Sequence, residues 1–275
     1  IIIFIISAAT GYAQENLFEA VKNNNIAVVE KLLSDGADIN MQNSDGQTPV
    51  LLAARLGRES ILKLFLDCNP DLYQADKYQY SLLHAAAEGG QVWFLKMLLD
   101  SGFSVDPHTT YDFTPLHVAI RHMRTEAVMF LVEHGASVAT PASNGSTPLH
   151  VAAEQEIPKY VQYLLDHGAD INAPNEWGTT PLHLAAVYGS YKICTILIQN
   201  GANLEAVNIN GDTPLHIAAR GYNPRTVELL CAAGADLNRK NINGQTPLQI
   251  AASMGNEKIL AVLNKYGEKP LTKEK

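Results

Sequence analysis

The sequence is poor in basic residues, and this restricts the partners that it could bind through charge. Lys and Arg total 20 against 28 Asp and Glu, which gives a formal net charge of −8. No long cluster of Lys or Arg interrupts this acidic background. Proteins that bind nucleic acids use basic patches to neutralise phosphates. The composition therefore argues against a nucleic-acid partner.

Sequence motifs that carry chemistry are also missing. The chain has no glycine-rich phosphate loop, no nucleophile elbow and no His-Glu-x-x-His helix. These absences argue against an enzyme, and we expect no catalytic residues and no bound cofactor.

Long apolar runs are absent, apart from a short one at the start of the chain. Residues 1–6 are apolar but too few to span a bilayer, and small residues follow at Gly11 and Ala13. This pattern is typical of the end of a secretory signal peptide cleaved after Ala13. It predicts a secreted or periplasmic protein whose mature chain does not insert stably into a membrane. The alternatives are a truncated transmembrane helix or a mistranslated start, and a cytoplasmic location.

The most regular feature of the chain is a motif that returns at an unbroken spacing of 33 residues. Its full form, Thr-Pro-Leu-His, begins at Thr114, Thr147, Thr180 and Thr213. Related copies begin at Thr48, Ser81 and Thr246. A fixed period of this size predicts an array of stacked repeats.

Each motif has the chemistry of a helix start. A Thr or Ser hydroxyl can cap the first free backbone N–H groups. Pro at the first helical position loses no needed donor and already has a helical φ. Five residues after each Thr or Ser comes Ala, which predicts a helix packed closely against its neighbours. These alanines are Ala53, Ala86, Ala119, Ala152, Ala185, Ala218 and Ala251.

The remainder of each repeat predicts a second helix and a hairpin. An apolar segment such as residues 227–230 has the spacing of a helix with one buried face. A column of glycines, with Asn69 as its one exception, fits the left-handed position that ends a helix. An extended piece and a turn dipeptide such as Asn144-Gly145 follow. The glycine column comprises Gly36, Gly102, Gly135, Gly168, Gly201, Gly234 and Gly267.

The Thr-Pro-Leu-His-x-Ala helix start and the Gly-Ala-Asp-x-Asn ending resemble the ankyrin repeat family, over residues from about 15 to about 269. The resemblance implies an all-α repeat solenoid, in which helix-turn-helix units are joined by β-hairpin loops. It implies a curved stack with a concave groove that binds a partner protein without catalysis. It also implies that each motif histidine is structural and hydrogen-bonds to the neighbouring loop.

The repeat spacing predicts one elongated domain. We expect a signal-peptide remnant at 1–13, the array at 14–269 and a flexible tail at 270–275, in a monomer. Glu15 stands in the first motif position, and polar first and last repeats suit terminal caps. The repeats lie near 15–47, 48–80, 81–113, 114–146, 147–179, 180–212, 213–245 and 246–269.

The three cysteines and the motif histidines look like candidates for a disulfide or a metal site, but stacking separates them. Equivalent helices of adjacent repeats lie about 8–10 Å apart, which is too far for a disulfide. We therefore expect Cys68, Cys194 and Cys231 to be free thiols, the last two buried. Zinc requires ligands that converge on one point, so repeated histidines predict no metal site.

Function must then lie on positions that vary between repeats, at the hairpin tips and on the exposed turn of the first helix. Aromatic and arginine side chains at such positions are typical of interface hot spots. The candidate partner-binding residues are Tyr78, Tyr80, Tyr111, Phe113, Arg121, His122, Trp177 and Tyr188. In the alternative interpretation, Tyr80 and Phe113 pack between adjacent hairpins. Trp93 is expected to be exposed on a second helix.

The sequence thus predicts a non-enzymatic protein-binding module whose partner it does not name. The alternatives are a secreted effector or toxin-like protein acting on a host, and a regulatory fragment of a larger protein. Structural spacing without a specific partner is the simplest further alternative.

Overall fold

The computed structural model of the protein describes residues 17–267. The predicted signal peptide at 1–13, the first motif position at Glu15 and the tail at 270–275 lie outside these residues. The chain divides into two compact units, unit 1 up to Ser137 and unit 2 from Val138 onward.

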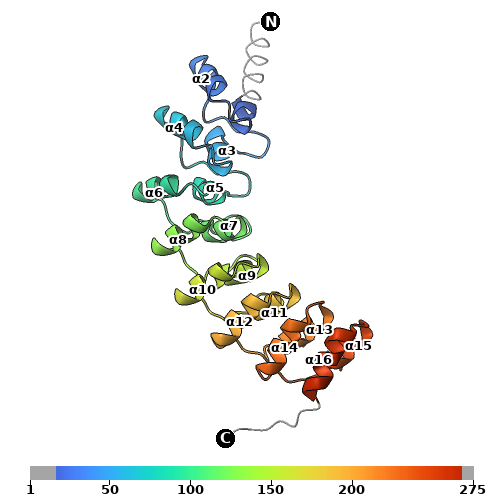
Figure 1. The fold of residues 1–275 in the computed structure, drawn as a ribbon. Helices are drawn as coiled ribbons and strands as arrows, with labels where there is room; N and C mark the ends of the chain where they lie inside the picture. The colour runs from blue at the N-terminus through green and yellow to red at the C-terminus, as the bar shows by residue number, and fades with distance from the viewer. Residues whose placement is uncertain (1–16, 268–275) are drawn as a thin grey trace. The chain divides into compact units, whose positions relative to one another are not determined.

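Unit 1 is built from pairs of short helices. The first helices of successive repeats pack on one another, α3 on α5 and α5 on α7, and α6 packs on α8 among the second helices. Unit 1 therefore has two layers of helices (Figure 1). Its helices cover 17–22 in the described part of the first, then α2 (Ile26–Ser34), α3 (Pro49–Arg55), α4 (Glu59–Asp67), α5 (Leu82–Gly89), α6 (Val92–Asp100), α7 (Pro115–Arg121) and α8 (Thr125–Glu133).

Unit 2 repeats the same plan. The first helices α9, α11, α13 and α15 pack in series, and so do the second helices α10, α12, α14 and α16. The helices are α9 (Pro148–Glu154), α10 (Pro158–Asp166), α11 (Pro181–Val187), α12 (Tyr191–Gln199), α13 (Pro214–Arg220), α14 (Pro224–Ala232), α15 (Pro247–Ser253) and α16 (Glu257–Gly267).

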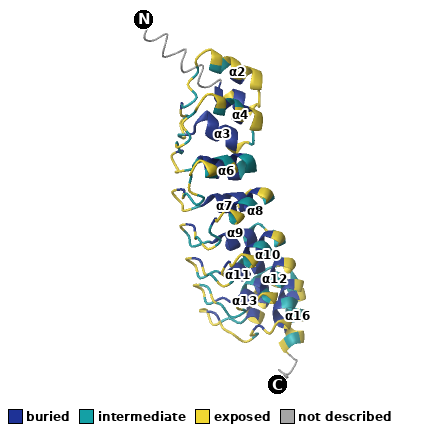
Figure 2. Cartoon of the chain, turned by 90° about the vertical axis from the view of Figure 1, so that its left-hand side faces the viewer, coloured by how far each residue is buried: buried dark blue, intermediate teal, exposed yellow. Residues whose placement is uncertain are grey.

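The core lies between the two layers of each unit. The predicted alanine column is buried, from Ala53 to Ala251. Each second helix contributes large apolar side chains to this core, such as Phe65 in α4 and Phe94 in α6. Figure 2 shows the consequence, because α3 and α7 are mostly buried whereas the connecting loops are largely exposed. The small alanines let the first helices approach closely, as the motif predicts.

The motif threonines and serine begin the first helices as predicted. Thr48 is the N-cap residue of α3, and its hydroxyl accepts a hydrogen bond from Leu51 N at 3.1 Å. In α5 the backbone N–H of Ser81 donates to His84 Nδ1 at 3.2 Å. The same backbone-to-imidazole bond occurs at Thr114, Thr147, Thr180 and Thr213.

The motif histidines also join consecutive repeats. Because Nδ1 accepts the backbone N–H, the ring proton lies on Nε2, which donates to a carbonyl 29 residues further on. These bonds run from His84 to Phe113 O, from His150 to Thr179 O, from His183 to Asp212 O and from His216 to Gln245 O, at 2.9–3.1 Å. The structural role of these four rings is therefore confirmed.

Burial lowers the pKa of these rings because it disfavours the charged imidazolium. The pKa of His84 falls to about 4, and those of His150, His183 and His216 are lowered as well. All four are therefore neutral at physiological pH.

The predicted left-handed residues end the second helices. The glycines from Gly36 to Gly234 have φ values of 86–96°, and Asn69 has φ 52°. Gly267, by contrast, is the last residue of α16. Between the paired helices, Met123 and Glu156 take left-handed φ values of 56° and 55° where glycine would be expected. The Gly221–Tyr222 turn differs, because Gly221 is extended at φ −77°, ψ −167° and Tyr222 is almost fully exposed.

The loops are hairpin turns without strands. Among residues 17–267 none is in a β-strand, so the expected extended pieces do not pair into ladders. Each tip is instead closed by two backbone hydrogen bonds, as from Asp76 N to Tyr80 O at 3.2 Å and from Gln79 N to Asp76 O at 2.9 Å. A further bond links successive tips, as from Thr110 N to Tyr78 O at 2.8 Å. Side chains such as Asp76 accept other tip N–H groups.

Two further expectations concern single side chains. Trp93 is only half-exposed, contrary to expectation, because Lys63 lies 5.2 Å from its ring and its Nε1 donates to Gln91 at 2.9 Å. Cys194 and Cys231 are free and buried as predicted, and burial raises the pKa of both thiols to about 12. The third cysteine, Cys68, is free and exposed.

Candidate protein-binding site

Six of the eight candidate residues meet in one cleft of unit 1. The cleft has a volume of about 420 Å³ and lies between hairpin tips and the first helices α5 and α7. The two remaining candidates, Trp177 and Tyr188, belong to unit 2. The residues lining the cleft are Arg55, Tyr78, Tyr80, Glu88, Thr109, Tyr111, Phe113, His117, Val118, Arg121 and His122.

Tyr78 and Tyr111 form the exposed rim of the cleft. Each stands at a hairpin tip that a side chain holds closed, with Tyr78 N donating to Asp76 Oδ1 at 2.8 Å and Tyr111 N donating to Thr109 Oγ1 at 3.3 Å. Their ring centroids are 6.4 Å apart. The two residues are 45% and 58% exposed, and Lys77 Nζ lies 5.1 Å from the Tyr78 ring centroid.

Glu88 organises one wall of the cleft. Its Oε2 atom accepts hydrogen bonds from Tyr80 Oη at 2.6 Å and from Arg55 Nε at 2.8 Å. The Arg55 guanidinium also lies 5.7 Å from the Tyr80 ring centroid. His122 Nε2 is 3.9 Å from Glu88 Oε1. Because Glu88 is largely buried, these contacts compensate a carboxylate that water does not solvate fully.

The titration of this wall follows from that burial. Burial, and then the charge of Glu88, raises the pKa of the Tyr80 hydroxyl. Burial disfavours the charged Arg55 guanidinium, but the hydrogen bond and charge of Glu88 outweigh it and raise the pKa of Arg55. Tyr80 and Arg55 are thus held in place by Glu88.

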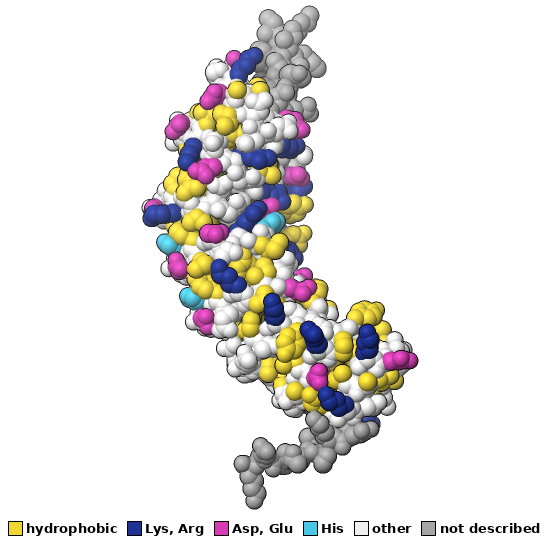
Figure 3. Space-filling model, viewed as in Figure 1, with side chains coloured by type: hydrophobic (Ala, Val, Ile, Leu, Met, Phe, Trp, Pro, Cys, Tyr) yellow, Lys and Arg dark blue, Asp and Glu magenta, His cyan; other side chains and the backbone are white. Residues whose placement is uncertain are grey.

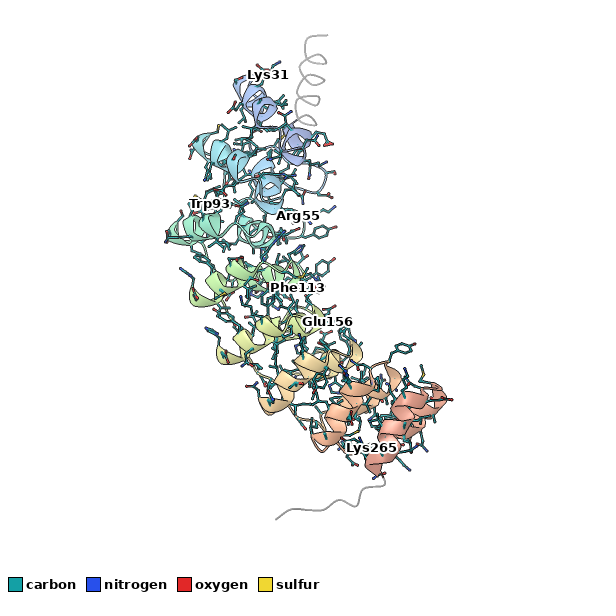
Figure 4. All side chains as sticks on the ribbon, viewed as in Figure 1. Lys31, Arg55, Trp93, Phe113, Glu156 and Lys265 are labelled. Carbon is teal, nitrogen blue, oxygen red and sulfur yellow. The ribbon has the colours of Figure 1, made fainter. Side chains whose placement is uncertain are left out.

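Arg121 closes the opposite wall. It is the last residue of α7, is exposed, and lies 5.3 Å from the centroid of the Phe113 ring. Such a position over an aromatic face is a cation–π contact, worth about 0.5–1 kcal/mol at an exposed site. Figure 4 shows Arg55 and Phe113 on the first-helix side of unit 1, with Trp93 on the other side.

Trp177 and Tyr188 are exposed in unit 2 and line no part of this cleft. Trp177 is 48% and Tyr188 46% exposed. Partial burial, followed by the charges of Glu154 and Glu156, raises the pKa of Tyr188. The surroundings of Tyr188 are therefore acidic.

The candidate list omitted Arg55 and Glu88, which build the cleft wall. A signal for them was present in the sequence, because Arg55 and Glu88 occupy equivalent positions of adjacent repeats and carry opposite charges. Val118 was also missed, since a buried helical valine gives no such signal.

The described residues contain no group of His, Cys, Asp and Glu side chains that could hold a metal ion. None of the described helices has the length and apolar character needed to cross a bilayer.

A family model of ankyrin repeats matches the chain at residues 17–110, 104–175, 138–208 and 182–274. The chain belongs to the ankyrin repeat family. A search of curated proteins gave no match. Ankyrin repeats are in general protein–protein interaction modules, and they are typically not enzymes. The cleft therefore lies in a fold whose common use is the binding of proteins.

Proposed function

We propose that the protein is a non-enzymatic interaction module that binds a partner protein through the hairpin tips and first helices of unit 1. The observation that carries this proposal is the cleft itself. Sequence positions chosen because they vary between repeats converge there, around two aromatic rings that are about half exposed. Exposed Tyr and Arg side chains around a hollow are typical of interface hot spots.

The cleft residues divide into two roles under this proposal. Tyr80 and Phe113 hold Glu88 and Arg121 in position. Tyr78, Tyr111 and Arg121 contact the partner. His122 lies at the edge of the cleft, next to Glu88. Trp177 and Tyr188 would form a separate contact area on unit 2.

The location of the protein is a further proposal. Residues 1–13 resemble the end of a signal peptide, and they support secretion or export to a periplasm. Fractionation of the source cells would test this. Finding the protein only in the cytoplasm would contradict it.

The binding proposal is tested by capture on the full-length protein. Partner proteins are identified by mass spectrometry for the wild type and for the Tyr78→Ala/Tyr111→Ala double variant. We expect the double variant to lose the captured partner. The matched control is Tyr191→Ala, because Tyr191 is equally exposed but lies on the second helix α12.

A partner retained by the unit 1 variant would contradict the proposed site. If Trp177→Ala/Tyr188→Ala released that partner instead, the contact would lie on unit 2. Circular dichroism of each variant shows whether the fold is unchanged.

A further inference from the structure

The carboxylates in and beside the cleft are already satisfied within the protein. Glu88 receives Arg55 and Tyr80, as described above. A smaller hollow of about 250 Å³ shares Arg55, Tyr78 and Tyr80 with the cleft and adds two further carboxylates. Of these, Asp45 pairs with Lys77 at 2.5 Å. Asp76 Oδ1 accepts the backbone N–H groups of Tyr78 and Tyr80 at 2.8 and 2.9 Å. Each of these three carboxylates therefore already has a hydrogen-bond or ion-pair partner within the protein.

The arginines of unit 1 are also occupied, with one exception. Arg58 donates to Lys22 O and Arg124 donates to Glu88 O, both at 2.7 Å. Arg55 is paired with Glu88. Arg121 has only the Phe113 ring, and no carboxylate within residues 17–267 pairs with it. Among the described arginines of unit 1, its guanidinium is therefore the one for which no N–H group has an acceptor, whereas Arg58 lacks one at Nε but not at Nη2.

Arg121 is available to pair with a carboxylate ligand. A guanidinium that lies over an aromatic ring keeps its N–H edge for a bidentate hydrogen bond to a planar anion. The side chains lining the cleft include two permanent cations, Arg55 and Arg121, against one anion, Glu88. This local excess of positive charge contrasts with the net charge of −8 of the whole chain.

The apolar part of the cleft adds a second requirement. Val118 and Phe113 lie in the lining, and the rings of Tyr78 and Tyr111 stand at the rim. A volume of about 420 Å³ falls within the range of about 300–1,000 Å³ that is typical of ligand-sized clefts. One large apolar side chain would bury the exposed parts of both tyrosine rings.

We propose that the unit 1 cleft binds an extended acidic segment of the partner protein. An Asp or Glu side chain of that segment pairs with Arg121, and a neighbouring aromatic or large aliphatic side chain lies between Tyr78 and Tyr111. This inference rests on the proposed function, because it names the kind of partner that the same cleft accepts. Figure 3 supports a local rather than a general charge effect, because described Lys and Arg side chains on the visible face are scattered among Asp and Glu.

Peptides of random sequence, displayed on phage and selected on the immobilised full-length protein, provide the test. We expect the selected peptides to be enriched in Asp or Glu within a few residues of Phe, Tyr, Trp, Leu or Ile. One selected peptide is then synthesised with both ends blocked, so that any carboxylate belongs to a side chain. A second version carries Asn or Gln in place of the acid, and binding is followed by fluorescence anisotropy.

A double-mutant cycle then connects the acid to Arg121. We expect Arg121→Gln to weaken binding of the acidic peptide by about tenfold, as for a lost charge-assisted hydrogen bond. The same change should leave the amide version almost unaffected, so the two effects are coupled. Phe113→Asp supplies Arg121 with an internal carboxylate and should weaken the acidic peptide similarly. The matched control is Arg225→Gln, because Arg225 is an exposed arginine on α14.

The outcomes separate this inference from the proposed function. The selected peptides could show no acidic enrichment and yet fail to bind the Tyr78→Ala/Tyr111→Ala variant. That result would overturn the acidic partner but keep the cleft as the binding site. An acidic peptide that binds Arg121→Gln as tightly as the wild type would also overturn it. Peptides that are unaffected by every cleft variant would overturn the proposed site itself.

Discussion

Arg121 in unit 1 and Arg220 in unit 2 occupy the same position of their repeats but serve different purposes. Each is the last residue of a first helix, α7 or α13. Eight residues earlier stands Phe113 in unit 1 and Asp212 in unit 2. Phe113 leaves the N–H edge of Arg121 free, whereas the buried Asp212 carboxylate accepts Arg220 Nη1 at 2.5 Å and Nη2 at 3.3 Å. The residue before the motif threonine thus decides whether the arginine pairs with a carboxylate or lies against an aromatic ring.

The hairpin tips of the two units also differ, in the residues at their left-handed positions. Unit 2 has glycine at each left-handed tip position, from Gly145 to Gly244. Unit 1 has glycine only at its first tip, Gly46, and has Gln79 and Asp112 at the next two, at φ 59° and 56°. These two residues lie directly beside the cleft tyrosines Tyr78 and Tyr111. Unit 1 therefore accepts less favourable backbone conformations at the very tips that form the candidate site.

The largest expected effect comes from removing the Asp212–Arg220 ion pair of unit 2. Asp212→Ala leaves the Arg220 guanidinium without its carboxylate and Asn241 Nδ2 without its acceptor at 2.8 Å. We expect the free energy of unfolding to fall by about 2–3 kcal/mol, which is less than for a fully buried pair because the Arg220 side chain is 38% exposed. Urea denaturation followed by circular dichroism measures this.

The comparison is made with two other variants. Glu88→Ala in unit 1 should cost less, because the Tyr80 hydroxyl retains His84 O at 3.3 Å and Arg55 is partly solvated. Glu176→Ala, at an exposed tip residue of unit 2, should change little. If Asp212→Ala were as mild as Glu176→Ala, the stabilising role of the Arg220 pair would be wrong.

The next effect concerns pH. The folded protein keeps His84 neutral down to its lowered pKa of about 4, whereas the unfolded chain takes up a proton below about 6.5. The free energy of unfolding should therefore change little near pH 7 and fall as the pH drops from about 6.5 to 4. His84 alone should contribute about 3 kcal/mol of this loss. The pKa values of His150, His183 and His216 in unit 2 are also lowered, so these residues also reduce the free energy of unfolding as the pH falls.

The chain itself suggests the test variant for this pH dependence. Gln249 replaces the motif histidine in the last repeat, and its Oε1 accepts Thr246 N at 2.9 Å. His84→Gln should preserve that bond while removing part of the pH dependence. Urea denaturation at pH 7.5, 6 and 5 should show a smaller loss for His84→Gln than for the wild type. An unchanged pH dependence would contradict the role given to His84.

The smallest expected effect concerns the tips. Gln79→Gly removes a side chain from a left-handed residue, and it should raise the free energy of unfolding by about 0.5–1 kcal/mol. The reverse change at the equivalent tip position of unit 2 is Gly178→Ala. The added Cβ would lie 3.1 Å from Asn208 Cα. This change should be destabilising. Thermal unfolding of both variants gives the comparison, and a lower melting temperature for Gln79→Gly would show that Gln79 makes a compensating contact.

The repeat pattern was sufficient to predict the helices because their causes are local. Thr114 caps α7, and Ala119 is buried in it, as the motif indicates. The left-handed Asn69 likewise follows from its own place in the glycine column. Six of the eight candidate residues, which were selected at positions that vary between repeats, also line one cleft.

Contacts between neighbouring repeats could not be predicted, because they depend on the conformations that long side chains adopt. Tyr80 looked like a contact residue, but its hydroxyl reaches Glu88 and is held there. Trp93 looked exposed, but Lys63 from the preceding repeat lies against its ring. The sequence places such residues in columns. It does not say which neighbour each side chain will meet.

The histidine bridges have a consequence for how such a chain can change in length. Each of the four rings finds its carbonyl 29 residues onward, so the partner is set by distance along the chain. Gain or loss of a whole 33-residue block returns every ring to an equivalent carbonyl. Gain or loss of one residue between ring and carbonyl leaves a buried imidazole N–H without its acceptor. Lengthening by duplication of complete repeats is therefore tolerated at places where a single inserted residue is not.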